Sequence, residues 1–558
     1  MYTGMKAGLT VLIGLTAVLS GCAEQQSAAP AVQEDLSEPG QFPITKEKIT
    51  LKVLVKGSPF IEDITTNEFT KYLEEKTNIH IEWDVAPEKS AAERLNIVLG
   101  SGDYPDVIMG FGVSSTQQLI YGSQGVFLPL NEMIEKSGIE TKKMFAEVPY
   151  AKDLITAPDG NIYALPQINE CYHCSLSQKM WIYKPWLDKL GLQMPTTTDE
   201  LYEVLKAFKT RDPNGNGKAD EIPLAGASIG PAVGIDQYIM NAFITNNVDG
   251  SPPNPEKRFF VSNGKVDVPF NKPEWKEGLK YLHKLYAEGL IAPQSFTQDR
   301  NQAKQMGENP DVPILGAALA QHNGTFTDFN GKSGRWLEFV TAPALKGPNG
   351  IQIAASRPYG LQGQQNWGMY LITSASKHPE AAFRLADALY SNEMALRTTI
   401  GRPDVEWAWA EKGEAGIDGQ PAIWKQLKVL PPGPQNIHWS QTGPSMRTNK
   451  FRFGQVADPN NPAELILYKE TKEKYEPYRQ DEKTVLPPLF FTNEQATEAA
   501  DLEKTINDYV KEMIARFVTG DVNIDSDWET YLKNLEDMNL QRYLEIYQLA
   551  YDAKYKKQ

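Results

Sequence analysis

Three observations predict an α/β fold with two or more lobes. The chain has 558 residues, which is more than a single domain usually contains. Its N-terminal third alternates strand-like and helix-like segments, the pattern that builds a doubly wound, mostly parallel sheet. Its C-terminal part instead repeats apolar residues at helical spacing. We therefore predict an α/β protein with doubly wound sheets and a helical C-terminal part.

The strand signal comes from side chains that alternate between apolar and polar. It covers Ile49 to Val55 and Ile79 to Val85, and a third strand fits Tyr104 to Met109. Helices fit the intervening residues 64–75 and 91–99. In such sheets ligands bind beyond the carboxyl ends of the strands, so we expect the ligand side of this lobe there.

Several helices are expected further along the chain. Thr197 and Glu200 make a capping box, and the apolar residues behind it fall on one helix face. Other helices fit residues 273–289 and 379–390, and residues 400–495 show little periodicity. The C-terminal stripes predict core aromatics; they are Ile506, Tyr509, Val510, Met513, Ile514 and Phe517, then Trp528, Tyr531, Leu532 and Leu535, then Tyr543, Ile546, Tyr547 and Ala550.

Composition and charge exclude some classes of function. The chain is 41% hydrophobic and 23% charged, as in a soluble globular protein. Its net charge of −15 argues against binding to a nucleic-acid backbone or to an anionic membrane surface through basic patches. A local cluster of Arg or Lys would still allow an anionic ligand.

The first 22 residues predict export. Lys6 precedes an apolar run from Leu9 to Leu19 that is too short to span a bilayer and is typical of a signal peptide. The run ends in Leu19-Ser20-Gly21-Cys22, which resembles the bacterial lipobox, so we expect Cys22 to be acylated. The alternative is an ordinary secreted protein with an incidental cysteine. Residues 23–45, beginning with a segment rich in Ala, Gln, Ser, Pro and Glu, are expected to form a flexible tether.

A row of oxygen-bearing side chains between glycines suggests a calcium loop. Calcium takes six to eight oxygen ligands, and short carboxylate and amide side chains at alternate positions can supply them. The match to an EF-hand breaks at its twelfth position, which is Pro223. The alternative is a polar turn without metal. The candidate ligands are Asp212, Asn214, Asn216, the carbonyl oxygen of Lys218, Asp220 and Glu221.

Two short motifs raise the alternative of a surface hydrolase. Gly226 to Gly230 fits G-x-S-x-G around Ser228, and Ser374 to Lys377 fits S-x-x-K. The first lacks a convincing helix behind it, and the second reads better as a helix start. A serine esterase or glycosidase acting on glycans therefore remains the rival to a binding protein.

Cys171 and Cys174 form a C-x-x-C pair. In an exported protein this spacing favours a short-range disulfide, and a free pair is the alternative. Zinc would require two more ligands, and only His173 lies nearby in the sequence.

Aromatic and polar residues in loop-like surroundings are candidate ligand contacts. Sugar rings pack their C–H faces on aromatic rings, while their hydroxyls require donors and acceptors, a mixture typical of ligand pockets. Ordinary packing is the alternative for each tryptophan. The candidates are Tyr172, Trp181, Arg357, Gln365, Asn366, Trp367, Trp407 and Trp439.

Several separated segments together resemble one family, the extracellular solute-binding lipoproteins of ABC transporters (family 1). The likeness is strongest to the LipO type and to alginate-oligosaccharide-binding proteins. It rests on residues 19–22, 102–108 (GDYPDVI), 157–166 (APDGNIYALP), 181–223, 377–382 (KHPEAA) and 517–520 with Trp528. One departure is Asp404-Val405-Glu406-Trp407, where the family commonly has Gly-Val-Asp-Trp.

The resemblance implies a two-lobe periplasmic-binding-protein-like fold (type II) with the ligand in an interlobe cleft. It also implies a structural calcium ion at the Asp212 loop, because relatives hold calcium in a loop of this form. The expected function is capture of a carbohydrate, with an oligosaccharide as the expected ligand. The protein would deliver it to ABC permease subunits from a lipid anchor on the outer face of the cell membrane. No catalytic residue and no nucleic acid are implied.

The expected organisation follows from these segments. Residues 1–22 are the signal peptide, 23–45 the tether, 46–165 the first part of lobe 1 and 166–310 the first part of lobe 2, with the calcium loop at 212–221. Residues 311–375 return to lobe 1, and 376–558 complete lobe 2 with the C-terminal helices.

Overall fold

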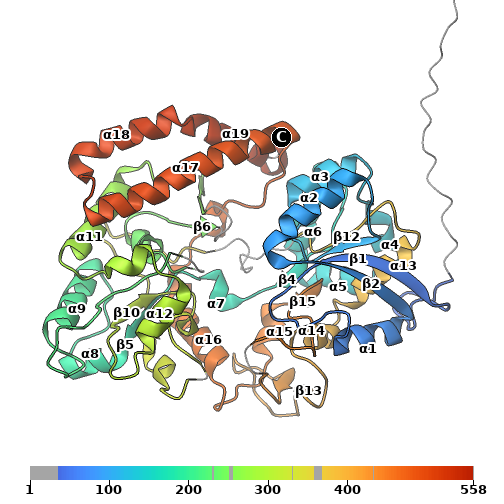
Figure 1. Ribbon diagram of the computed structural model, residues 1–558, viewed down its shortest axis with the longest axis horizontal. Helices are drawn as coiled ribbons and strands as arrows, with labels where there is room; N and C mark the ends of the chain where they lie inside the picture. The colour runs from blue at the N-terminus through green and yellow to red at the C-terminus, as the bar shows by residue number, and fades with distance from the viewer. Residues whose placement is uncertain are drawn as a thin grey trace, which may run out of the picture. The chain divides into compact units, whose positions relative to one another are not determined.

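The computed structural model describes residues 35–228, 232–249, 256–329, 331–356, 367–430 and 433–556 (Figure 1). The predicted signal peptide, Cys22 and most of the predicted tether lie outside these ranges. From Glu34 onward the chain is one compact unit. Within it, buried apolar residues form separate cores, which we use to define a first and a second lobe. No helix in the described ranges has the length and apolarity needed to cross a membrane.

The first lobe contains the predicted parallel sheet. Strand β1 (Ile49–Lys56) lies between β2 (Ile79–Ala86) and β3 (Val107–Met109), parallel to both. Helices α1 (Glu68–Thr77) and α2 (Ala91–Ser101) connect these strands. A strand from much later in the chain, β12 (Tyr370–Ile372), adds antiparallel to β3. The predicted strand–helix order is confirmed for this lobe.

The second lobe has a different sheet. Strand β5 (Met180–Tyr183) lies between β10 (Ala317–Leu319) and β11 (Phe339–Thr341), and both pairings are antiparallel. Among the described residues of this lobe, parallel pairing occurs as isolated bridges, such as Ile222 with Leu315 and Ala225 with Ala318. The two-lobe α/β fold is confirmed, but this sheet is mixed rather than parallel.

The two cores divide the chain differently from the predicted boundaries. Leu315 and Ala317 pack in the second core, whereas residues 311–375 were expected in lobe 1. Residues from Trp367 to Met394 pack in the first core, although most were assigned to lobe 2. The reason is that β12 is buried throughout and pairs with β3, a long-range contact that periodicity does not reveal.

Along the described residues, membership changes three times between these two cores, so the chain passes between them at least three times. The passages follow Ile168, Ala354 and Met446. At the first and third, β4 (Gln167–Asn169) pairs in parallel with β15 (Ser445–Arg447), and the N–H of Glu170 donates to the carbonyl oxygen of Arg447. Two of the segments that connect the lobes therefore run side by side as paired strands.

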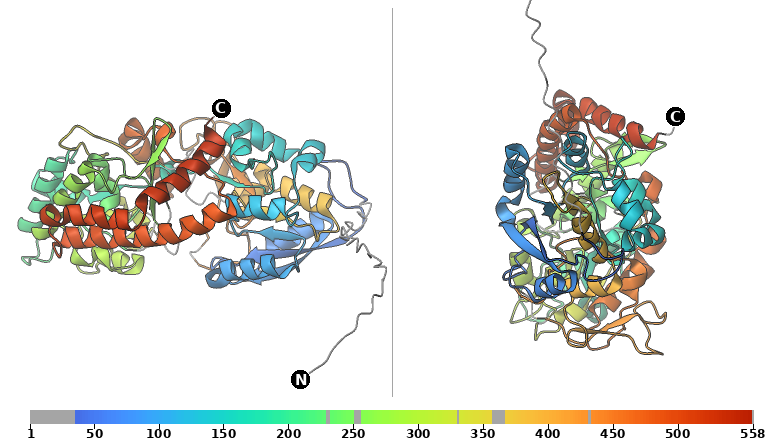
Figure 2. Two further views of the ribbon diagram at one scale, coloured as in Figure 1. Left: turned by 90° about the horizontal axis from the view of Figure 1, so that it is seen from above. Right: turned by 90° about the vertical axis from the view of Figure 1, so that its right-hand side faces the viewer.

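Three helices form the C-terminal part (Figure 2). They are α17 (Asn493–Thr519), α18 (Ile524–Asp537) and α19 (Leu540–Tyr555). Helix α17 packs on α11 (Pro273–Ala287) and α19, and it also touches α3 (Ser115–Ser123) of the first lobe. It ends at Gly520, whose φ of 85° suits glycine. The predicted core aromatics are confirmed, since Trp528, Tyr531, Tyr543 and Tyr547 are buried.

The remaining elements cover the sheets or connect them. The helices are α4 (Asn131–Ser137), α5 (Glu140–Glu147), α6 (Pro149–Ile155), α7 (Tyr172–Ser175), α8 (Lys184–Leu190), α9 (Thr198–Thr210), α10 (Ile235–Ile239), α12 (Arg300–Gly307), α13 (Pro379–Ala388), α14 (Asn392–Thr399), α15 (Asn449–Phe453) and α16 (Ala463–Lys474). The strands are β6 (Val248–Asp249), β7 (Lys257–Arg258), β8 (Phe260–Ser262), β9 (Lys265–Asp267), β13 (Trp407–Trp409) and β14 (Trp424–Gln426).

Candidate functional site

Helix α9 delivers the chain into the acidic loop. Its capping box is present, because Glu200 N–H donates to Thr197 Oγ1 (3.1 Å) and the Glu200 carboxylate accepts from the N–H of Thr197 (3.2 Å). After the helix, Asp212 takes a left-handed φ of 45°. Its Oδ1 accepts from the N–H of Gly215 (2.9 Å) and its Oδ2 from that of Gly217 (3.1 Å). The loop thus curls around the Asp212 carboxylate.

The amide side chains of the loop converge on a second carboxylate. Asn214 and Asn216 both donate from Nδ2 to Asp220, at 2.8 Å and 2.9 Å. These hydrogen bonds hold the pKa of Asp220 below its usual range. A half-turn of each amide would present its oxygen in place of its NH2 group.

Glu221 is the last of the candidate calcium ligands, and its surroundings show whether this loop fits a cation. Its Oε1 is buried and has no hydrogen-bond partner in the described part of the chain. Burial, together with the charges of Asp212 and Asp220, raises the pKa of this carboxyl. An orphaned carboxylate oxygen beside two other carboxylates is costly alone and is satisfied by a cation. The donor set, all oxygen, therefore fits calcium.

The cysteine pair is bonded. Cys171 and Cys174 form a disulfide with an S–S distance of 2.05 Å. His173 lies with them in a group of potential metal ligands, but both sulfur atoms are used by the disulfide. Burial and nearby positive charges keep the pKa of His173 well below its usual value. This cluster is therefore not a zinc site in its oxidised form.

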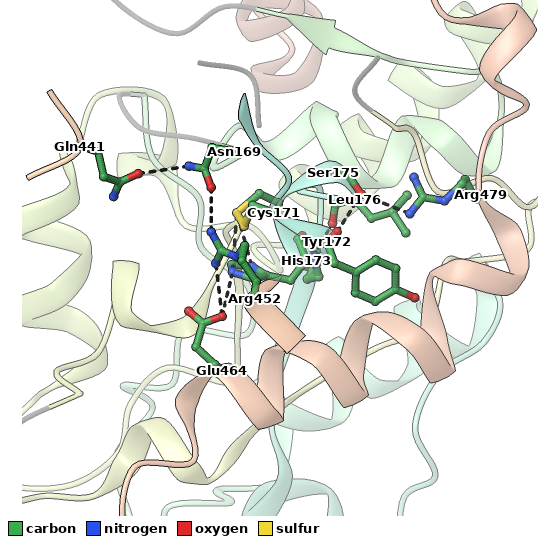
Figure 3. Close-up of a disulfide and its surroundings, with 12 residues drawn as sticks. Asn169, Cys171, Tyr172, His173, Ser175, Leu176, Gln441, Arg452, Glu464 and Arg479 are labelled. Carbon is green, nitrogen blue, oxygen red and sulfur yellow. Dashed lines mark hydrogen bonds and ion pairs between the residues drawn. A yellow bond between two sulfur atoms is a disulfide. The ribbon is translucent and has the colours of Figure 1, made fainter. Parts of the chain in front are cut away.

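A polar network surrounds the disulfide where the lobes join (Figure 3). Asn169 donates to Gln441 Oε1 (3.1 Å) and accepts from Arg452 Nη1 (2.9 Å). Arg452 Nη2 lies 3.4 Å from the Glu464 carboxylate. These contacts tie β4 to α15 and α16.

A cavity of about 560 Å³ lies between residues of both lobes, and we call it the interlobe cavity. From the first lobe it is lined by residues 114–117 at the start of α3, which follow the carboxyl end of β3 as predicted for the ligand side. The second lobe contributes Asn247, Lys257 and Phe259. The lining is completed by Trp367, residues 485–489, Phe491, α17 and Tyr547. Aromatic rings and polar groups are therefore combined in one place.

Three of the predicted ligand contacts are wrong, because their side chains are buried in the cores. Trp181 is fully buried and donates to the carbonyl oxygen of Ala320 (3.0 Å). Trp407 donates to Gly401 (2.8 Å) and Trp439 to Thr70 Oγ1 (2.8 Å). Their indole N–H groups are satisfied internally, so none is available to a ligand.

The other predicted contacts have different outcomes. Trp367 is also buried in the first core, but it lines the interlobe cavity. Tyr172 is half-buried, and its ring meets Phe453 edge-on at 5.5 Å, so it belongs to the junction between the lobes. Arg357, Gln365 and Asn366 lie outside the described residues. Sequence reasoning missed Lys257 and Asn247 of the cavity lining, because no motif surrounds them.

Ser228 does not show the surroundings of a catalytic nucleophile. Within the described ranges its hydroxyl donates to the carbonyl oxygen of Gln298 (3.0 Å) rather than to a histidine. A serine nucleophile requires a base within hydrogen-bond reach.

Comparison with known proteins identifies the family. Residues 54–396 match the bacterial extracellular solute-binding proteins. The chain is also 31% identical, over 97% of both chains, to the fructooligosaccharide ABC transporter substrate-binding protein FusA of Streptococcus pneumoniae. The chain belongs to the bacterial extracellular solute-binding proteins. Its predicted role as a substrate-binding protein of an ABC importer is therefore confirmed.

Solved structures agree with this assignment. FusA of S. pneumoniae in complex with kestose superposes with a TM-score of 0.72 at 30% identity, covering 90% of this chain and 99% of that one. A further FusA structure is described as an EF-hand mutant bound to fructo-nystose. The Bacillus subtilis lipoprotein LipO is 27% identical over 59% of this chain and 62% of its own. All of these relatives are binding proteins by name or belong to the predicted lipoprotein type.

Proposed function

We propose that this protein captures an oligosaccharide in the interlobe cavity and delivers it to ABC permease subunits. The observation that carries the proposal is that both lobes line one cavity with aromatic and polar side chains. Closing the lobes on a ligand buries it and gives the permease a distinct shape to read. The similarity to FusA over nearly the whole chain supports a sugar as the ligand.

Fructo-oligosaccharides are the first ligand class to test. FusA is named for this class, and its structure contains kestose. At 31% identity the fold and role are shared, whereas the side chains that select a sugar are free to differ. We also propose that Trp367 and residues 114–117 at the N-terminus of α3 contact the sugar.

No covalent chemistry is part of the proposed function. The rival is a glycan hydrolase using Ser228, and the hydrogen bond of this hydroxyl to Gln298 speaks against it. The two differ in outcome, since a hydrolase converts the sugar that it binds.

We propose calcium as a structural ion of the second lobe. Asp212, Asn214, Asn216, the Lys218 carbonyl oxygen, Asp220 and Glu221 would hold it. When bound, the ion supplies positive charge that satisfies Glu221 and fixes the end of α9 against the bridge of Ile222 with Leu315. The loop lies away from the interlobe cavity lining, so its role is stability rather than ligand binding.

The proposed anchor is an acylated Cys22 on the outer face of the membrane. The described end of the predicted tether packs on the first lobe, where Ile44 N–H donates to the carbonyl oxygen of Thr77 (3.0 Å). Lys46 pairs with Asp35 at 2.7 Å. The tether would therefore hold the first lobe, leaving the second lobe free to move.

Calorimetry of residues 23–558 against kestose, other neutral oligosaccharides and uronate oligosaccharides tests the proposal. We expect one panel member to bind with micromolar or tighter affinity and to be recovered unchanged. Product formation would support the hydrolase, and absence of binding across the panel would refute an oligosaccharide ligand. Globomycin-sensitive processing and loss of membrane retention in Cys22→Ser test the anchor.

A further inference from the structure

A second, smaller cavity lies beside β15, and we call it the Arg447 cavity. Its volume is about 160 Å³, and its lining includes Arg447, Arg452, Trp424, Gln455, Asn461 and Glu464. One water molecule occupies about 30 Å³ of the liquid, so the cavity is large enough for a small group but not for an oligosaccharide. It shares no lining residue with the interlobe cavity.

Arg447 differs from the other half-buried arginines in the described part of the chain. Its side chain is half-buried, and no hydrogen bond or ion pair of its guanidinium is present in the described part of the chain. By contrast Arg384 and Arg397, which are similarly sheltered, each pair with a glutamate at 2.9 Å and 2.8 Å. A guanidinium carries five N–H donors, and leaving them unsatisfied away from bulk water costs free energy.

The charge of the cavity is not balanced. Arg447 and Arg452 together face a single carboxylate, that of Glu464, which is already 3.4 Å from Arg452. Burial, reinforced by the charge of Arg452, lowers the pKa of Arg447 to about 9. The cavity thus has donors in excess of acceptors.

Other polar side chains in the lining are also available. The side chains of Gln455 and Asn461 have no protein partner within the described ranges. The rings of Trp424 and Phe451 lie stacked beside them, with centroids 6.2 Å apart. Available donors, amides and aromatic edges around a small space are the features of a site for one sugar unit.

We propose that the Arg447 cavity is a binding subsite that holds one monosaccharide unit of the ligand through its oxygen acceptors, with Arg447 as the principal donor. The inference rests on the proposed function, because it takes the ligand to be a saccharide. The acceptor is either a pair of ring hydroxyls or the carboxylate of a uronate. Both offer oxygen lone pairs to the guanidinium fork.

The position of Arg447 connects this subsite to the junction of the lobes. It is the last residue of β15 and pairs with Asn169 of β4. Asn169 in turn accepts from Arg452, which lines the same cavity. Occupation of the cavity therefore acts on the strands through which the chain passes between the lobes.

The test compares Arg447→Met, Arg447→Lys and the control Arg384→Met by calorimetry and thermal unfolding. The ligand is whichever of kestose or a uronate trisaccharide binds the wild type. We expect Arg447→Met to weaken binding at least tenfold relative to the wild type. The affinity of Arg447→Lys should lie between those of the wild type and Arg447→Met. Without ligand, Arg447→Met should melt no lower than the wild type, because it removes an unpaired charge. Arg384→Met should melt lower and bind normally.

The outcomes separate the claims. If the wild type binds a sugar and Arg447→Met binds it equally well, the subsite is wrong while the proposed function stands. If ligand-free Arg447→Met unfolds more easily than the wild type, Arg447 is a structural residue and the inference is overturned. If no sugar binds the wild type, both proposals fail. A tenfold loss that shrinks at high salt identifies a carboxylate, and a salt-independent loss identifies hydroxyls.

Discussion

Replacing Glu221 by Gln gives the clearest test of the acidic loop, because two opposite effects are expected. Without calcium, the wild-type carboxylate has a buried Oε1 with no partner in the described ranges and lies near the charges of Asp212 and Asp220. A neutral amide of the same shape removes this repulsion. Glu221→Gln should therefore be as stable as the wild type in chelator, or more stable.

With calcium the order reverses. A ligand that binds only the folded state stabilises it by about 2.7 kcal/mol when its concentration is 100 times Kd. For a cooperative unit of lobe size, 1 kcal/mol shifts Tm by about 2–4 °C, so the wild type should gain about 5–10 °C. Glu221→Gln loses a charged ligand and should gain far less at the same calcium concentration.

The assay is differential scanning calorimetry at fixed ionic strength, with and without chelator, followed by calcium titration. Asp418→Asn is the matched control, because Asp418 also accepts from a backbone N–H (that of Gln420, 3.0 Å) in a glycine-containing turn. This control should keep the full calcium response. If chelator does not change the wild-type Tm, or if Glu221→Gln responds to calcium as the wild type does, the calcium reasoning is refuted.

Three further predictions concern stability. Gly316→Ala should cost about 1–3 kcal/mol in urea unfolding, because its Cβ would lie 2.5 Å from the Phe208 ring and 2.9 Å from Trp186. Gly100→Ala, where the Cβ meets nothing within 4 Å, is the control and should not destabilise. The pKa of His438 is lowered from 6.5 to about 4 by burial of the neutral ring. Its contribution to the free energy of unfolding is therefore fully present above pH 6.5 and is lost as the pH falls towards 4. At about 1.36 kcal/mol per pH unit, the loss of stability from His438 is at most about 3 kcal/mol. The variant His438→Asn should therefore have a flatter curve of stability against pH between pH 6.5 and 4. An unchanged slope would contradict this account. The double change Cys171→Ser and Cys174→Ser opens a loop of sequence separation 3 and should cost about 2 kcal/mol by chain entropy, measured without reductant. Reductant should then lower the wild-type stability and leave the double variant unaffected.

Local features of the fold were predictable because their causes are local. The capping box of Thr197 and Glu200 and the glycine stop at Gly520 depend on residues within one or two helical turns. The first strands of the first lobe were predictable because part of β1 and of β2 alternates between buried and exposed side chains, which the sequence displays directly. The disulfide-compatible spacing of Cys171 and Cys174 belongs to the same class.

Long-range features were not predictable for the opposite reason. Pairing of Tyr370–Ile372 with β3 joins residues more than 250 positions apart, and no periodicity encodes the partner. Trp181, Trp407 and Trp439 resemble ligand contacts by type, and only the assembled cores show that they are buried. Arg447 reads as one arginine among many until its lack of a protein partner in the described ranges becomes visible.

The three passages between the lobes restrict how the lobes can move. One connecting segment would let the two bodies swivel about it in any direction. Two of the connecting segments are paired side by side as β4 and β15, and this pairing resists twisting and sliding of one lobe against the other. The protein therefore has a small set of accessible shapes, and a transporter that recognises one of them can tell a loaded molecule from an empty one without contacting the ligand.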